Sequence, residues 1–253
     1  MSGRVTEIWR HPVKSMRGER VEETSVGALG VDGDRRFGVL DVERGSVLSA
    51  KRAPALFLCA SRYDEAGDVN VTLPDGTTFG SGPDLDAALS ALIGRPVSLV
   101  AAEDHSEALI QMAAEDTSTE GESTEWPAPP GTVFDASPIH FLTTSTLRRY
   151  RELYPQGDFD ARRFRANFVL DTGDGARFVE EAWIGREIRV GDAELHVTKG
   201  CSRCVMTTLE QPGLERDRMI LRTVARENHN NLGVRAIVTR SGRVAVGDSM
   251  APG

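Results

Sequence analysis

The sequence predicts a mainly β protein with some α, a β-barrel or sandwich and not a doubly wound α/β sheet. Two observations carry this prediction. Many short runs alternate apolar and polar residues and end at Gly, Pro, Asp or Ser, whereas apolar residues at helical spacing occur in only a few segments. The 253 residues, 40% of them hydrophobic, are enough for one large core or two modest ones without disulfide or metal staples.

The first hundred residues are predicted to be rich in strands. The run that opens the chain stops at His11-Pro12, where the proline ends regular extended pairing. The turn residues between neighbouring runs indicate hairpins, and Gly94 is a natural helix stop. In chain order the expected segments are strands 4–13, 37–42, 46–50, 56–63 and 69–73 and a helix at 83–93.

The last hundred and twenty residues are also predicted to be mostly β. Ser145 is placed to cap a helix, and Ser241-Gly242 is placed to turn a final hairpin. The expected segments are strand 139–142, helix 145–153, strands 167–171, 187–190 and 194–197, helix 216–228, and a hairpin of 234–239 with 243–246.

The segment between these two regions changes character. Residues 103–131 gather Glu, Asp, Ser, Thr and Pro and hold few large apolar side chains, as a surface loop or inter-domain linker does. We therefore expect a smaller N-terminal β-rich domain over 1–105, an acidic linker or loop over 106–131, and a C-terminal barrel over 132–253.

Charge balance and cysteine count exclude several classes of function. The 38 acidic residues outnumber the 30 basic ones and give a net charge of −8, which argues against nucleic acid or an anionic membrane as partner. No apolar run approaches the about 18 residues of a transmembrane helix, and residues 1–10 hold no signal-peptide core. Three cysteines are too few for a disulfide framework, so we expect a cytoplasmic protein.

The stretch 199–208 is the most informative because it holds a Cys-x-x-Cys pair, Cys201 and Cys204. Four interpretations stay open. A structural zinc site needs four ligands, and the sequence offers no second pair at suitable spacing. A thioredoxin-like dithiol begins at a helix N-terminus, but the β-branched residues after Cys204 favour a strand. Otherwise both cysteines are simply buried, or one thiolate binds a soft metal while Ser202 and Arg203 hold an anionic group beside it.

Three further clusters supply anion-binding residue types. Lys14-Ser15 follows the first predicted strand, and a lysine beside a hydroxyl suits a phosphate. Arg36 stands at the entrance of a second strand, and Arg165 and Asn167 lie two residues apart, so that both side chains point to one face. Each cluster alone is as typical of solvated surface as of a site, and their combination is what indicates anion binding.

Taken together, these stretches resemble a MOSC (molybdenum cofactor sulfurase C-terminal) domain protein with the N-terminal MOSC β-barrel region. The likeness is greatest to the amidoxime-reducing component family and its bacterial relatives. It extends over nearly the whole chain, and Cys-Ser-Arg-Cys-x-x-Thr-Thr is its most specific motif. The matching segments are 11–15, 33–37, 137–138, 164–167, 201–208 and 246–248. The resemblance implies a MOSC β-barrel plus a smaller N-terminal β-rich domain.

The same resemblance implies the molybdenum cofactor, Mo-molybdopterin, with Cys204 as metal ligand and catalytic residue. Cys201 has no ligand role in it, and we expect a small buried side chain. The chain departs from the family at Ala136, where the amidoxime-reducing enzymes have a threonine, and at Arg235, where they have a tyrosine. The implied cofactor-binding positions are Lys14, Ser15, Arg36, Ser137, Pro138, Arg165, Asn167, Ser202 and Arg203. We add Arg235 to them, because an arginine at this departure can still reach a phosphate; the alternative is that it faces solvent.

The resemblance thus implies an oxidoreductase that reduces N-hydroxylated compounds such as amidoximes and hydroxylamines. We expect neither the membrane anchor nor the ferredoxin domain of some relatives, and therefore a separate electron-transfer protein as donor. Because residues from both ends must reach one cofactor, residues 1–36 are expected to pack onto the C-terminal barrel around a shared cleft. Two alternatives remain, a sulfur or cofactor carrier with a persulfide on Cys204, and a cofactor-storage module without turnover.

Overall fold

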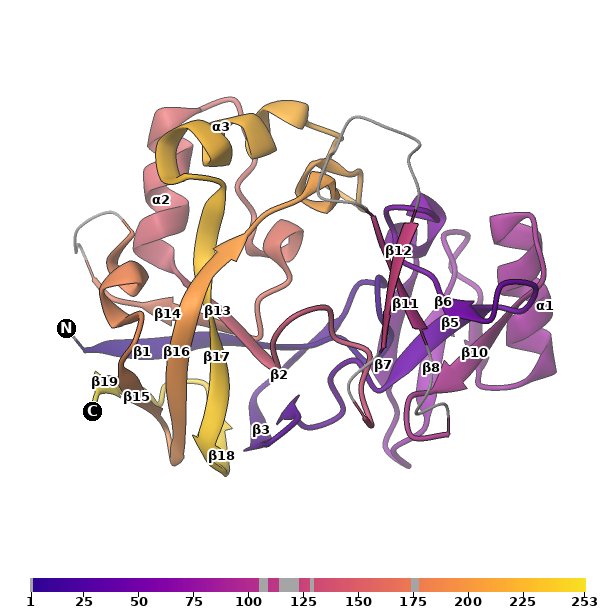
Figure 1. The fold of residues 1–253 in the computed structure, drawn as a ribbon, viewed down its shortest axis with the longest axis horizontal. Helices are drawn as coiled ribbons and strands as arrows, with labels where there is room; N and C mark the ends of the chain where they lie inside the picture. Colours follow the sequence, from indigo (N-terminus) through magenta and orange to yellow (C-terminus); the bar gives the residue numbers. More distant parts are fainter. Residues whose placement is uncertain (1, 105–108, 114–122, 128–129, 174–177) are drawn as a thin grey trace.

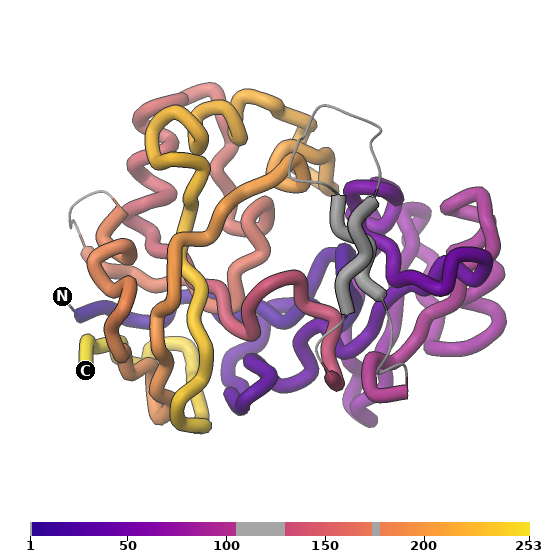
Figure 2. Tube along the Cα trace, viewed as in Figure 1, coloured from indigo at the N-terminus to yellow at the C-terminus, as the bar shows by residue number. Residues whose placement is uncertain are grey.

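The computed structural model describes residues 2–104, 109–113, 123–127, 130–173 and 178–253 and is mainly β, as the sequence predicts. Figure 1 shows two masses of β structure side by side, a barrel with two helices above it and a group of smaller sheets with one helix at the outer edge. The two chain ends lie together at the side of the barrel (Figure 2).

The larger mass is a closed barrel of seven strands in the order β14, β13, β17, β16, β15, β19 and β1, with β1 pairing back to β14. Their bounds are β1 Gly3–Arg10, β13 Ile139–Thr143, β14 Phe168–Asp171, β15 Glu187–Val190, β16 Ala193–Ser202, β17 Asn231–Arg240 and β19 Ser249–Pro252. A short strand, β2 (Glu19–Val21), pairs with β1 outside the ring. A strand from the N-terminus therefore completes a barrel that is otherwise built from residues 139–252.

Apolar side chains fill the inside of the barrel. Ile8 of β1, Phe168 of β14 and Leu195 of β16 are fully buried, and the ring of Trp183 lies 5.9 Å from that of Phe141. All five residues of β13 are buried, because this strand pairs on both sides and its outward-facing Leu142 packs under the helices. The β13 sequence, Ile-His-Phe-Leu-Thr, therefore does not alternate regularly between apolar inward-facing and polar outward-facing residues.

Two helices form the second layer over the barrel. Leu147 and Tyr150 of α2 (Thr144–Leu153) pack with Ile220 and Val224 of α3 (Arg218–Asn228). Short 3-10 turns connect the elements: η1 Pro54–Leu58, η2 Ala161–Phe164, η3 Val179–Trp183 and η4 Val205–Thr208.

The helix caps follow from side-chain oxygens next to each start, although one expected cap is wrong. The α2 helix is capped by Thr143, whose hydroxyl accepts from the amide of Thr146, and Ser145 lies inside the first turn. The α3 helix starts two residues later than expected because the Asp217 carboxylate accepts from the Met219 amide.

The described residues form three further sheets. In one of them β3 pairs with β18 on one side and β4 on the other, and this sheet packs into the barrel core through Val26, Val31 and Val244. The other two sheets form the smaller mass.

In the smaller mass, a five-stranded sheet has the order β10, β5, β6, β11, β12, and a three-stranded sheet has the order β7, β8, β9. Leu85 and Leu89 of α1 (Pro83–Ile93) are fully buried in the core of this mass, beside Leu56 of η1. The strand bounds are β3 Glu23–Gly27, β4 Gly30–Val31, β5 Phe37–Asp41, β6 Ser46–Val47, β7 Ala60–Tyr63, β8 Val69–Thr72, β9 Thr78–Gly80, β10 Val97–Ala101, β11 Leu109–Ala113, β12 Ser123–Pro127 and β18 Gly242–Ala245.

The final hairpin that the sequence predicts is wrong. β17 ends at Arg240, and β18 then leaves it to pair antiparallel with β3, from Gly242 opposite Val26 to Ala245 opposite Glu23. The chain can leave β17 for β3 at this point because residue 242 is glycine. A Cβ there would lie 2.4 Å from the main-chain carbonyl carbon of Asp192. Close backbone contact thus replaces the tight turn that Ser-Gly suggests.

The acidic segment 106–131 is only partly described. Within it, β11 pairs parallel with β6 and antiparallel with β12, so ten of its residues extend the five-stranded sheet where the sequence suggested a linker or loop. The run Leu-Ile-Gln-Met-Ala has the apolar content of a strand, which the surrounding acidic composition hides. The remaining expectations for this segment fall on 105–108, 114–122 and 128–129, outside the described residues.

Candidate functional site

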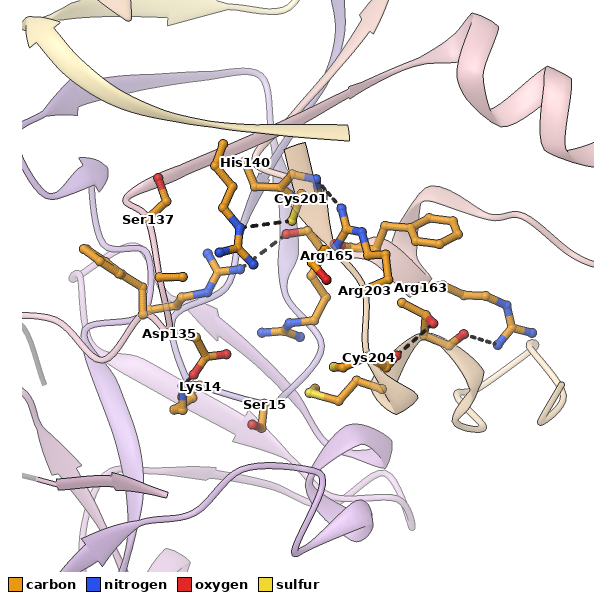
Figure 3. A pocket seen from close by; sticks show the side chains of 18 residues that line it. Lys14, Ser15, Asp135, Ser137, His140, Arg163, Arg165, Cys201, Arg203 and Cys204 are labelled. Atoms are coloured by element: carbon orange, nitrogen blue, oxygen red, sulfur yellow. Dashed lines mark hydrogen bonds and ion pairs between the residues drawn. The ribbon is translucent and has the colours of Figure 1, made fainter. Parts of the chain in front are cut away.

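A cleft lies where the barrel meets the N-terminal sheets, and both contribute to its walls. It encloses about 820 Å³, including the volume open to solvent. Figure 3 shows Lys14, Asp135 and Ser15 toward one end, His140 and Cys201 toward the other, and Cys204 on a side between them. The predicted site residues that line it are Lys14, Ser15, Ser137, Arg165, Ser202, Arg203, Cys204 and Arg235.

Cys204 sits on the turn that follows the barrel strand β16. Its backbone is extended, with φ −130° and ψ 179°, and the amide and hydroxyl of Thr207 both donate to its carbonyl, at 3.1 and 3.0 Å. The β-branched residues after it form the 3-10 turn η4 and not the strand that the sequence favoured. The Cys204 thiol is unpaired and half-buried, so it is accessible from the cleft.

A fully buried arginine supports this turn from behind. The Arg163 guanidinium donates to the carbonyls of Leu209 at 3.2 Å, Glu215 at 2.7 Å and Asp158 at 2.8 Å, and more weakly to that of Thr207 at 3.5 Å. Only 2% of Arg163 is exposed. Because main-chain carbonyls in a loop need buried donors, Arg163 fixes the shape of the segment that presents Cys204.

Cys201 faces the same cleft, although the resemblance gives it no ligand role. It is 6% exposed, and the Arg235 Nε donates to its Sγ at 3.4 Å. Burial alone raises the pKa of this thiol, but the Arg203 guanidinium and His140 outweigh burial and hold the pKa well below its ordinary value. Cys201 is therefore a polarised sulfur and more than a small filler.

The Lys14–Ser15 turn follows β1 and carries the N-terminal wall. The Lys14 amide donates to the Phe37 carbonyl at 2.8 Å, and the Ser15 hydroxyl accepts from the Ala50 amide at 3.0 Å. The Lys14 ammonium donates to the Val133 carbonyl at 3.0 Å and pairs with Asp135. Burial lowers the pKa of Lys14, an effect that the Asp135 carboxylate opposes.

Arg165 projects from the turn after η2 into the middle of the cleft. Its backbone is left-handed, with φ 54°, and its Nη1 donates to the Met16 carbonyl. Its Nη2 is buried and has no hydrogen-bond partner among the described residues. Burial, with Arg35 nearby, lowers the pKa of Arg165 to about 9. A buried cation with an unused donor is the environment that an anionic ligand completes.

Three predicted residues do not line the cleft. Arg36 turns away and donates to the Gly131 carbonyl at 2.8 Å, while its neighbour Arg35 lines the cleft instead. Asn167 is buried behind the wall, where its Oδ1 accepts from the His140 amide at 3.1 Å. Pro138 is buried against Gly30, where its carbonyl is 2.3 Å from a would-be Cβ.

The sequence reasoning missed several lining residues. Arg35 was one position away from a chosen residue, and neighbouring side chains at a strand entrance point in different directions. Asp135 and His140 flank the chosen Ser-Pro pair, but nothing in the sequence shows that the loop and β13 face Cys204. Met206 follows Cys204 by two residues and was taken as strand.

The donor set fits an anionic ligand that carries a soft metal. Six lysine and arginine side chains line the cleft against one carboxylate, that of Asp135. In the described portion of the chain no three His, Cys, Asp or Glu side chains are grouped to hold a metal ion, which a structural zinc site requires. A metal here would therefore need ligands from an organic group beside one thiolate, and Cys204 is the accessible one.

Two family models match separate parts of the chain. Residues 2–90 match the MOSC N-terminal beta barrel domain, and residues 129–251 match the MOSC domain. The chain is therefore a MOSC-domain protein that also has the N-terminal MOSC domain.

Individual relatives are more distant. The chain is 25% identical over 238 residues to human mitochondrial amidoxime-reducing component 1, and 26% identical over 236 residues to bovine mitochondrial amidoxime reducing component 2. Each match covers 82% of this chain, which spans 66% of the human and 67% of the bovine protein. The crystal structure of YuaD from Bacillus subtilis is similar in fold, with a TM-score of 0.53 at 12% identity, over 99% of this chain and 94% of that one.

Among the described residues, no helix combines the length and apolar character needed to cross a membrane.

Proposed function

We propose that this chain binds a molybdenum cofactor in the cleft and reduces N-hydroxylated compounds such as amidoximes and hydroxylamines. The observation that carries the proposal is the accessible Cys204 thiol in a cleft with six cationic side chains drawn from both the N-terminal region and the barrel region. The amidoxime-reducing relatives support the reaction class. In this proposal the N-terminal domain, residues 1–105, and the barrel, residues 132–253, hold the cofactor jointly.

Different residues would hold different portions of the cofactor. Cys204 would bind the metal as a thiolate. Lys14, Ser15 and Arg165, which cluster through the Arg165–Met16 contact, would bind the phosphate tail, with Arg35 taking the place that the resemblance gives to Arg36. Asn167 would not contact the cofactor itself. It would position the wall of the cleft, because its Oδ1 accepts from the His140 amide.

The reaction consumes two electrons and two protons for each N–O bond that breaks, and water leaves with the oxygen. When bound, a molybdenum cofactor supplies two-electron oxygen-atom transfer. The protein's role is to hold the cofactor, to exclude competing ligands from the metal, and to place the substrate oxygen near Cys204. A separate electron-transfer protein would deliver the electrons, and the three unpaired cysteines support a reducing compartment such as the cytoplasm.

Molybdenum content per chain tests the proposal. Wild type, Cys204→Ser and the matched control Cys201→Ser are purified from a host that makes the cofactor, and molybdenum is measured by elemental mass spectrometry. We expect near-stoichiometric metal in wild type, with metal or benzamidoxime reduction lost in Cys204→Ser and largely kept in Cys201→Ser. No molybdenum in wild type would overturn the proposal, and metal without any turnover would indicate a storage module.

A second candidate function is sulfur transfer through a persulfide on Cys204. The observation that favours it is the accessibility of Cys204 in a cationic cleft, which stabilises an anionic persulfide, while Cys59 and Cys201 are buried. Incubation with a cysteine desulfurase and free cysteine, followed by intact-mass spectrometry, tests it. An added sulfur atom that is absent from Cys204→Ser would support the carrier function, and no added sulfur in wild type would exclude it.

A further inference from the structure

The cleft holds more cationic groups than its own carboxylate can neutralise. Lysine and arginine side chains contribute six positive charges to the lining, and the one carboxylate, that of Asp135, is already paired with Lys14. The whole chain carries a net charge of −8, so this concentration of positive charge is local to the cleft. An electropositive concave surface attracts anions.

Most of these cations have structural partners. Arg163 is saturated by main-chain carbonyls, as described above. Arg203 donates to the carbonyls of Leu232 and Phe164, at 2.8 and 3.0 Å, and contacts His140. Arg35 pairs with Asp34 and donates to the Arg165 carbonyl. The terminal nitrogens of these three arginines are therefore occupied by contacts that hold the shape of the site.

Two of the arginines that line the cleft keep terminal nitrogens to which no described residue is hydrogen-bonded. One is Arg165, through its buried Nη2. The other is Arg235, whose Nε donates to Cys201 and whose two terminal nitrogens make no hydrogen bond or ion pair with the described residues. The planar fork of a guanidinium with two free nitrogens matches the two oxygens of a carboxylate.

The two arginines with unused donors belong to different walls of the cleft. Arg165 is bound to the Met16 carbonyl and so lies with the Lys14–Ser15 turn. Arg235 is on β17, opposite Lys199 in the β16–β17 register, and its Nε contacts Cys201. The proposed phosphate position uses the first wall, which leaves the second without an anion.

We propose that Arg235 binds an anionic group of the substrate, so that this chain selects N-hydroxylated compounds that carry a carboxylate. The inference rests on the proposed reductase function and deepens it, because it assigns Arg235 to substrate recognition instead of cofactor binding. A charge-assisted pair in a partly closed cleft contributes roughly 10- to 100-fold in affinity. Arg235 is thus a specificity-determining residue.

The test compares two substrates that differ in one group. 4-Carboxybenzamidoxime carries the anion, and 4-carbamoylbenzamidoxime has nearly the same shape without charge. Cofactor-loaded wild type, Arg235→Gln, Arg235→Lys and Arg189→Gln are assayed with a viologen reductant that needs no donor protein. Arg189 is the matched control because it is exposed on β15 and does not line the cleft.

The measured quantity is the ratio of kcat/KM for the carboxylate to kcat/KM for the carboxamide. We expect Arg235→Gln to lower this ratio at least about 10-fold, through KM, while Arg235→Lys recovers some of it and Arg189→Gln leaves it unchanged. An unchanged ratio in Arg235→Gln would overturn the proposal. Equal loss with both substrates, in proportion to lost molybdenum, would assign Arg235 to the cofactor and also overturn it.

A binding measurement separates this inference from the proposed reaction. Isothermal titration calorimetry of the same four proteins with 4-carboxybenzamidoxime, without reductant, needs no turnover. Weaker binding to Arg235→Gln alone, with no reduction of either compound by wild type, would keep the anion site and reject the reductase function. Equal binding to wild type and Arg235→Gln would reject the anion site whatever the activity.

Discussion

The guanidinium of Arg165 donates a hydrogen bond to the main-chain carbonyl of Met16, although 149 positions separate the two residues in the chain. The bond joins the turn before β14 to the loop after β1, so the two walls of the cleft are linked through a side chain that itself faces the cleft. Its stacking over the Phe57 ring, with 5.6 Å from Cζ to the centroid, adds a contact with the N-terminal core.

Arg165 leads to a prediction about anion binding by the cofactor-free protein. Inorganic phosphate is expected to raise the melting temperature of wild type, because it supplies the partner that the buried Nη2 lacks. At ten times the dissociation constant the gain is about 1.4 kcal/mol, which corresponds to a few degrees for a chain of this size. Arg165→Met should lose this gain.

Calorimetric scans at constant ionic strength, with chloride replacing phosphate, check the prediction. Arg162→Met is the matched control, because Arg162 precedes the same turn but pairs with Asp160. Equal stabilisation of Arg165→Met and Arg162→Met by phosphate would show that the anion binds elsewhere.

The buried guanidinium of Arg163 makes the Cys204 turn sensitive to a single substitution. Arg163→Met leaves the carbonyls of Asp158, Leu209 and Glu215 without their donor, and we expect the free energy of unfolding to fall by at least about 3 kcal/mol. Faster amide hydrogen exchange over 205–209 should accompany the loss of stability, since the Arg163 guanidinium donates to the carbonyls of Thr207 and Leu209.

Urea unfolding and hydrogen exchange measure the two effects. Arg163→Lys should recover only some of the stability, because an ammonium cannot reach three separate carbonyls. Unchanged exchange over 205–209 in Arg163→Met would mean that the turn holds its shape without this arginine.

Acid is expected to weaken the fold through His11. Burial and the nearby Arg165 lower the pKa of His11 to about 3, whereas a histidine in the unfolded chain takes up its proton near pH 6.5. Between these values the unfolded state binds a proton that the folded state does not, so the free energy of unfolding falls as pH falls. The slope reaches about 1.4 kcal/mol per pH unit.

Urea unfolding at pH 6.5, 5.5 and 4.5 tests this slope. His11→Gln should flatten it, although a share stays because burial also lowers the pKa of His140. Burial disfavours the Asp34 carboxylate, but Arg35 and His11 outweigh burial and lower its pKa, so Asp34 acts at still lower pH. His229→Asn is the control, since His229 is exposed. Parallel slopes in wild type and His11→Gln would contradict the assignment.

Eight of the residues chosen from the sequence line one cleft, whereas the connections around that cleft were predicted less well. Cys204 and Lys14 were chosen for their chemistry, and a thiol or an ammonium keeps that chemistry in any fold. Arg36 was chosen because it stands at the entrance of a predicted strand. Arg35 lines the cleft instead, because side-chain direction depends on the local turn, and Arg35 has a left-handed φ of 51° that the sequence does not reveal.

Pairing between strands that are far apart in the chain was also not predicted from the sequence. The departure of β18 from β17 depends on how closely the chain approaches Asp192, a distance that no local pattern encodes. The strand run at 109–113 was hidden because composition averaged over the whole segment 103–131 reports the acidic residues on either side of it.

Gly30 and Gly27 face each other in the β3–β4 pair and provide a matched test of the wall that carries Ser137 and Pro138. Gly30 has a φ of 94°, and a Cβ there would lie 2.3 Å from the Pro138 carbonyl oxygen, whereas a Cβ on Gly27 meets nothing within 4 Å. We expect Gly30→Ala to lower the free energy of unfolding by at least about 2 kcal/mol, from left-handed strain and the clash, and Gly27→Ala to change it by no more than about 0.5 kcal/mol.

Relief of that clash must move the Ser137–Pro138 segment, which contributes Ser137 to the cleft. Molybdenum content measured beside urea unfolding therefore reports on the site as well as on the fold, and Gly30→Ala should lose metal while Gly27→Ala keeps it. If the two variants unfold at the same urea concentration and retain equal metal, the close approach of Gly30 to Pro138 does not shape the cleft.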